Sequence, residues 1–171
     1  MKFIYKLNLS LAALFLATCL FNVTETIAQI QAGGGLAYGT NVEKLGLQVN
    51  GYYTIPANEQ IRAGIEYTYF FPENYEGGGS SRYSEFNVNG NYLFLEEDEI
   101  TAYGLAGLNY TTVSWSGNQF FGASGSRTGL NLGAGAEYQA GFGVLYGELK
   151  FVVSTFDQLV LSLGTRIPFD I

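Results

Sequence analysis

The sequence predicts an all-β protein, an eight-stranded antiparallel up-and-down transmembrane β-barrel preceded by a cleavable signal peptide. Three observations predict this fold class. Along almost the whole chain, as in 61–71, large apolar residues alternate with mostly small, polar or charged residues, which is the period of a strand with two unlike faces. Glycine occurs 23 times and tyrosine and phenylalanine 13 times each, which favours strands and turns. Turn residues then divide the chain after position 28 into eight runs without convincing helical periodicity.

The first segment, 1–28, is predicted to be the signal peptide. Lys2 and Lys6 precede an apolar stretch, 11–21, and small residues follow up to Ala28, after which we expect cleavage. The stretch is shorter than the roughly 20 apolar residues that a membrane-spanning helix needs.

The remaining segment, 29–171, is predicted to form one outer-membrane β-barrel domain. The only cysteine in the chain is Cys19, inside the predicted signal peptide, so the domain has neither a disulfide nor a thiol nucleophile. The chain carries 8 basic and 15 acidic residues, a net charge of −7. Because no basic patch offsets this charge, nucleic acid is not expected as a partner.

Each of the eight runs is long enough to cross a bilayer, because a tilted membrane strand needs about 9–11 residues. The predicted strands are 30–39, 45–55, 61–71, 82–94, 99–113, 128–139, 144–154 and 158–169. Short turns are expected at one end of the barrel, and two long loops, 72–81 and 114–127, at the other. Membrane barrels have short periplasmic turns and longer external loops, so the long loops are placed outside.

The run 99–113 has the least decisive alternation. Ile100, Leu108 and Tyr110 lie on one phase, and Tyr103 and Leu105 lie on the other. We expect the even-numbered residues to face outward, although a shift of one residue in register would reverse that assignment.

Seven charged residues fall inside the predicted strands, away from the strand ends where Arg82 and Glu99 stand, and all seven are on the phase opposite to the apolar residues. They are Arg62, Glu66, Glu85, Glu137, Glu148, Lys150 and Arg166. An eight-stranded barrel is just filled by its own side chains, and an isolated buried charge costs several kcal/mol. The sequence therefore predicts a lumenal network of ion pairs, without indicating which acid pairs with which base.

The last run carries a polar residue, a glycine, a hydrophobic residue and a near-terminal aromatic residue at Ser162, Gly164, Ile167 and Phe169. This spacing resembles the C-terminal insertion signal of bacterial outer-membrane proteins. With the signal peptide and the eight runs, the chain resembles the small outer-membrane barrels of the OmpA/OmpX type over essentially its full length. The resemblance implies location in the outer membrane of a Gram-negative bacterium, contact with outer-membrane lipid, and recognition by the barrel assembly machinery through β-augmentation.

Enzymatic functions are restricted by the absence of histidine, which barrel acyltransferases and phospholipases use as the general base. The segment 122–126 resembles a nucleophile elbow only superficially, because it ends in serine and lies in a predicted loop. Four acids in 96–99 lack the spacing of a calcium loop. No enzymatic activity, cofactor or metal site is predicted.

Aromatic residues in the two long loops are the candidates for contact with an extracellular ligand of unknown identity. They are Tyr75, Trp115, Phe120 and Phe121; an interfacial girdle is the alternative role for Trp115. We expect a non-catalytic barrel with a structural or surface-interaction role similar to adhesion. One alternative is a narrow ion or small-solute channel, in which exchanging ion pairs open a path. Another is a soluble periplasmic barrel of the lipocalin kind, with apolar residues inward and charges outward.

Overall fold

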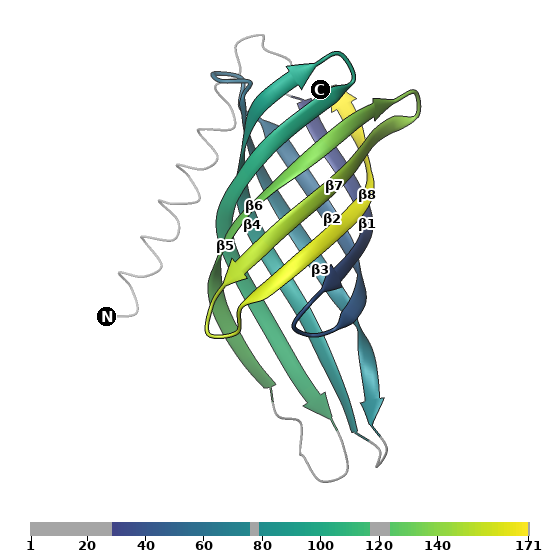
Figure 1. Ribbon diagram of the computed structural model, residues 1–171, viewed down its shortest axis with the longest axis vertical. Helices are drawn as coiled ribbons and strands as arrows, with labels where there is room; N and C mark the ends of the chain where they lie inside the picture. Colours follow the sequence, from purple (N-terminus) through teal and green to yellow (C-terminus); the bar gives the residue numbers. More distant parts are fainter. Residues whose placement is uncertain (1–28, 76–78, 117–123, 171) are drawn as a thin grey trace, which may run out of the picture.

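The computed structural model describes residues 29–75, 79–116 and 124–170, which form one closed antiparallel barrel (Figure 1). Its strands are β1 (Gln29–Gly39), β2 (Lys44–Thr54), β3 (Ile61–Tyr75), β4 (Gly79–Glu97), β5 (Ile100–Ser116), β6 (Ser124–Ala140), β7 (Gly143–Val153) and β8 (Gln158–Asp170). Each strand pairs with its neighbours in sequence, and β1 pairs with β8 to close the barrel. The predicted eight-stranded antiparallel fold is confirmed, whereas the predicted signal peptide lies outside the described residues. In the described part of the chain, no helix is long and apolar enough to cross a bilayer.

The barrel has two unlike ends. At the loop end, the strands are joined through 40–43, 76–78, 117–123 and 154–157. At the turn end, they are joined through 55–60, 98–99 and 141–142, and β1 begins and β8 ends there. The connections at 98–99 and 141–142 are tight, and Asp98 adopts a φ of 43° to make the first of them.

Four neighbouring strands, β3 to β6, are longer than the rest. They contain 15, 19, 17 and 17 residues, whereas β1, β2 and β7 contain 11 each. Most of the extra residues lie at the loop end, where the β3–β4 and β5–β6 hairpins project beyond the other strands (Figure 1). β4 is also extended at the turn end, where Leu95, Glu96 and Glu97 pair with β5.

The prediction of two long loops is therefore wrong for most of 72–81 and for half of 114–127, where 114–116 and 124–127 continue the strands. Pro72 does not end β3, because it falls at a register shift between Phe70 and Glu73, where a ladder hydrogen bond is missing in any case. In the other hairpin, Ser114 pairs with Ser124. Side chains such as Ser126 and Arg127 are exposed in these extensions, so the apolar alternation from which the strands were predicted fades there.

Large apolar side chains cover the outside of the barrel. Leu47, Leu108 and Leu163 are 52%, 63% and 70% exposed. On β5, Leu108 and Tyr110 are exposed whereas Tyr103 and Leu105 are buried, so the expected outward facing of the even-numbered residues is confirmed.

The inside of the barrel is filled by side chains. One apolar cluster, Ala37, Phe70, Val152 and Val160, lies toward the loop end, and a second, Leu93, Tyr103 and Leu105, lies toward the turn end. Between the two clusters, the buried side chains are mainly polar or charged.

Glycines allow the closing strands β1 and β8 to approach closely. A Cβ atom on Gly33 would lie 2.1 Å from the carbonyl oxygen of Thr165, and one on Gly35 would lie 2.2 Å from that of Leu163. Any larger residue at either position would force the two strands apart.

Candidate functional site

All seven charges expected in the lumen lie inside the barrel. Arg62, Glu66, Glu85, Glu137, Glu148, Lys150 and Arg166 are each less than a tenth exposed, and within 29–75, 79–116 and 124–170 they are the only buried charged residues. The period-two pattern of the strands places them there, because every one has the parity of the inward-facing residues on its strand.

Arg166 on β8 is the centre of the first ion-pair group. Its Nη1 donates a hydrogen bond to Oε1 of Glu137 at 2.5 Å, and its Nη2 lies 3.9 Å from Oε2 of Glu148. Its Nε donates to Oδ1 of Asn50 at 3.1 Å. Arg62 donates from Nη1 to the other oxygen of Glu137 at 2.7 Å. One carboxylate thus joins two guanidinium groups that come from β3 and β8.

Three tyrosine rings surround the Arg166 guanidinium. Its Cζ lies 3.9 Å from the ring centroid of Tyr146, 4.4 Å from that of Tyr52 and 6.0 Å from that of Tyr103. Cations over aromatic faces are attracted by the ring quadrupole, more so when the pair is shielded from water. The hydroxyl of Tyr103 also donates to Oε2 of Glu148 at 2.9 Å. These tyrosines were not among the predicted site residues. Their positions on the inward-facing phase of their strands could have indicated that they lie in the lumen.

Two of these rings occupy the space above a glycine on the neighbouring strand. Tyr52 lies directly opposite Gly64, and Tyr103 lies opposite Gly135. A Cβ atom at Gly64 would be 2.3 Å from the Tyr52 ring, and one at Gly135 would be 2.4 Å from the Tyr103 ring. The glycines therefore provide the room in which the tyrosines reach Arg166.

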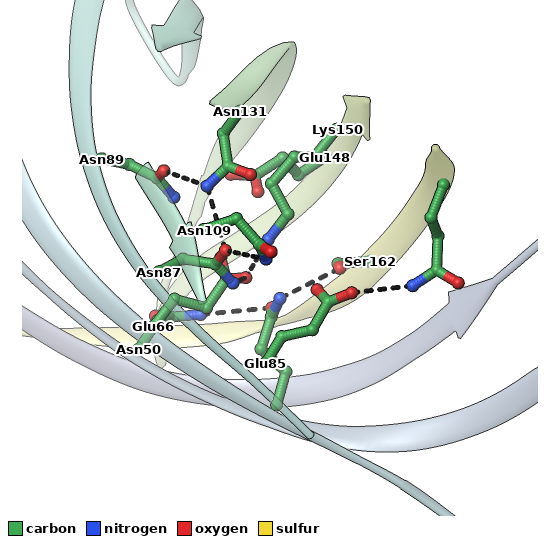
Figure 2. Close-up of polar contacts among 12 residues, drawn as sticks. Asn50, Glu66, Glu85, Asn87, Asn89, Asn109, Asn131, Glu148, Lys150 and Ser162 are labelled. Carbon is green, nitrogen blue, oxygen red and sulfur yellow. Dashed lines mark hydrogen bonds and ion pairs between the residues drawn. The ribbon is translucent and has the colours of Figure 1, made fainter. Parts of the chain in front are cut away.

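The second ion-pair group is centred on Lys150 of β7. Its Nζ donates to Oε1 of Glu66, and Nδ2 of Asn87 donates to the same oxygen at 2.9 Å (Figure 2). Asn109 and Asn131 both donate to Oδ1 of Asn87, at 2.8 and 3.0 Å. Figure 2 shows that these amides meet in the lumen. They connect the ion pair between β3 and β7 to β4, β5 and β6.

Glu85 on β4 differs from the other six charges. It makes no ion pair among the described residues, and its Oε1 accepts a hydrogen bond from Nε2 of Gln158 at 2.8 Å (Figure 2). The lumen contains four carboxylates and three cationic side chains, so one carboxylate remains without a cation of its own.

The residues expected to contact an external ligand are only partly described. Trp115 lies near the loop end of β5 and is 41% exposed. It shares the parity of the buried residues Leu105 and Val113, so it belongs to the inward-facing phase above the lumen and not to an outward-facing girdle. The side chain of Tyr75, at the end of β3, lies outside the described residues, as do Phe120 and Phe121.

The four residues of the expected assembly signal all lie on β8. Ser162 is buried and accepts a hydrogen bond from Nε2 of Gln48 at 3.1 Å, and Gly164 pairs with Gly35 across the closing seam. Ile167 and Phe169 are exposed on the outside. In the part of the chain that the structure describes, no three potential ligand side chains gather around a common metal position.

The closed antiparallel architecture is that of the small β-barrels of bacterial outer membranes, and the resemblance to barrels of the OmpA/OmpX type is confirmed for the fold. Ail, the attachment invasion locus protein of Yersinia pestis, is 16% identical, with a TM-score of 0.61 over 85% of this chain and 100% of that one. Neisserial surface protein A is 18% identical, with a TM-score of 0.63 over 83% and 97% of the two chains. The N-terminal β-barrel domain of Pseudomonas aeruginosa OprF is 14% identical, with a TM-score of 0.63 over 84% and 98%. No protein-family model and no curated protein matches the sequence.

Proposed function

We propose that this protein is an integral barrel of the bacterial outer membrane, non-catalytic, with a structural and surface-interaction role. The observation that carries the proposal is the distribution of side chains across the barrel wall. Large apolar residues are exposed on the outside, and the buried charges lie inside. Exposure of that surface to water costs about 25 cal/mol per Å² of apolar area, and lipid removes the cost. A soluble barrel of the lipocalin kind has the reverse arrangement.

The lumen supports a structural role for the ion-pair network. Arg166 and Lys150 are each 1% exposed and held by carboxylates, and apolar clusters lie toward both ends. Breaking a buried pair by removing one partner costs about 3–5 kcal/mol, so the network favours one closed arrangement. The same contacts argue against the alternative of a permanently open channel.

The projecting ends of β3 to β6 support the surface-interaction role. They extend past the other strands at the loop end and carry exposed side chains, among them Trp115 and Arg127. Membrane barrels place their longer connections outside the cell, which puts this extension there. One of the proteins with a similar fold, Ail, is named for attachment and invasion, and this supports an adhesive role.

We also assign β8 as the strand that the barrel assembly machinery engages. Its support is the sequence pattern at Ser162, Gly164, Ile167 and Phe169, together with the position of β8 as the strand that closes the barrel. Pairing of a free strand with another protein uses backbone hydrogen bonds, which the edge of β8 offers until β1 joins it.

The surface-interaction role is tested by deleting 117–125 and measuring adhesion of cells that express the protein to cultured epithelial cells. We expect a correctly assembled barrel, seen by its heat-dependent migration on a gel, and adhesion reduced to the level of cells without the protein. Phe142→Ser is the control, because Phe142 is 71% exposed at the opposite end. Unchanged adhesion with an assembled deletion variant contradicts the role.

A further inference from the structure

A cleft opens at the loop end of the barrel, above the apolar cluster that contains Phe70. Its cavity volume is about 100 Å³. This is below the roughly 300–1,000 Å³ of sites for drug-sized molecules and suits a small, compact ligand. Residues from β3, β4, β5, β6, β7, β8 and the adjoining turns line it, and we call it the mouth cleft.

The walls of the mouth cleft are mainly apolar and aromatic. Tyr83, Val113, Trp115 and Phe156 belong to them, and Arg127 stands among them with its Cζ 5.5 Å from the ring centroid of Phe156. The aromatic lining thus already contacts one cationic group. All these side chains except Phe156, which lies in the β7–β8 turn, have inward parity on their strands.

One carboxylate also lines the mouth cleft. Glu85 is 2% exposed, and its Oε1 is occupied by Gln158. Its Oε2 is buried and has no hydrogen-bond partner. The charged groups that act on Glu85 from the lumen are Lys150 and Glu66, but these two pair with each other. Among the described residues, Glu85 is the lumenal carboxylate without a cation, and it lines the mouth cleft.

We propose that the mouth cleft binds a compact organic ammonium ion with an apolar body. The ammonium group donates to Oε2 of Glu85, and the apolar body lies between Val113, Trp115 and Phe156. A buried carboxylate gains most from a cation that also donates hydrogen bonds, and aromatic rings add attraction for the same charge.

Other ligand classes fit the mouth cleft less well. An anion would meet the charge of Glu85, and a neutral apolar molecule would leave Oε2 without a partner. A divalent metal ion requires several oxygen ligands, and among the described residues Glu85 is the only carboxylate that lines the cleft. The proposal depends on the fold and on Glu85, and it stands independently of any adhesive role.

The binding of 2-phenylethylammonium to the full chain in detergent micelles tests the proposal directly. Trp115 is the only tryptophan, so its fluorescence reports on the cleft without a label. We expect a saturable change, with an affinity at least about tenfold higher than that for neutral 2-phenylethanol, because only the ammonium makes a charge-assisted hydrogen bond to Glu85. Equal affinities for the two compounds, or no saturable change with either, would overturn the proposal.

A pair of matched substitutions locates the site. Glu85→Gln keeps the shape of the side chain and removes its charge, and we expect it to weaken ammonium binding about tenfold or more. Glu43→Gln makes the same charge change in the exposed β1–β2 turn at the same end and should bind the probe as the wild type does. Wild-type affinity in Glu85→Gln would refute the assignment. If this variant does not fold, the comparison of ammonium with alcohol in the wild-type protein still decides.

Discussion

At the scale of single residues, the centre of this barrel is Arg166. Its guanidinium contacts two carboxylates and three tyrosine rings that come from four different strands. The sequence predicted that Arg166 lies in the lumen, because parity along one strand is a local property. It did not predict the partners, since the contacts join residues far apart in the chain, such as Arg62 and Glu137, which are 75 positions apart. Partners of this kind depend on barrel closure and strand register.

Removal of the Arg166 charge should destabilise the barrel strongly. Arg166→Leu leaves Glu137 and Glu148 without their shared cation, and we expect a loss of about 3–5 kcal/mol in the free energy of unfolding, measured by urea titration in lipid vesicles. Arg82→Leu, which removes a charge from an exposed position, should change it by less than about 0.5 kcal/mol. Equal effects of the two substitutions would show that the ion-pair network does not stabilise the fold.

A methyl group at Gly64 should also be costly. The added Cβ lies 2.3 Å from the buried Tyr52 ring, so Gly64→Ala should lower the free energy of unfolding by about 1–3 kcal/mol through overpacking. Gly90→Ala is the matched control, because the nearest atom to its Cβ is 3.8 Å away. If the same unfolding assay finds both variants as stable as the wild type, Tyr52 moves freely and does not fix the position of Arg166.

At the scale of the strands, the sequence predicted their number and the facing of each. The alternation failed mainly at the loop end, where β3 to β6 continue beyond the predicted boundaries. On β6 both faces of this extension are exposed, as at Ser126 and Arg127, so polar residues and glycines stand where the strand has no apolar face to mark it. The pairing of Val113 with Gly125 was therefore not readable from residue type.

The projecting part of the β5–β6 hairpin should be dispensable for folding. We expect a barrel of near wild-type stability when Val113 is joined to Gly125, its cross-strand partner, through a two-residue Asn-Gly turn. Deletion of Leu132 alone should instead prevent assembly, because it moves the following β6 side chains to the opposite face. Heat-dependent gel migration measures both, and an assembled Leu132 deletion would contradict the register that we describe.

At the scale of the whole molecule, the interior determines whether ions pass. The lumen holds fully buried side chains along its length, from Val160 toward the loop end to Leu93 toward the turn end. The fold and the composition of the lumen were predictable from the sequence because both follow from the alternation of apolar and polar residues along each strand. The mouth cleft was not, because it combines single residues from many strands.

The filled lumen should make the protein electrically silent. In a planar lipid bilayer, the purified barrel is expected to give no steady conductance above that of the lipid alone, because two apolar clusters and two ion-pair groups occupy the path. Reproducible current steps from the folded wild-type protein would favour the channel alternative.

The most direct test of the whole account is the surroundings of the outer wall. Spin labels are attached through single cysteines at Leu47, Leu108 and Leu163, with Cys19 replaced by serine, and the protein is placed in lipid vesicles. The account predicts that these labels collide with oxygen dissolved in the hydrocarbon and are shielded from a water-soluble nickel complex, whereas a label at the exposed Glu59 behaves in the opposite way. Ready access of the nickel complex to all three leucine positions would contradict it.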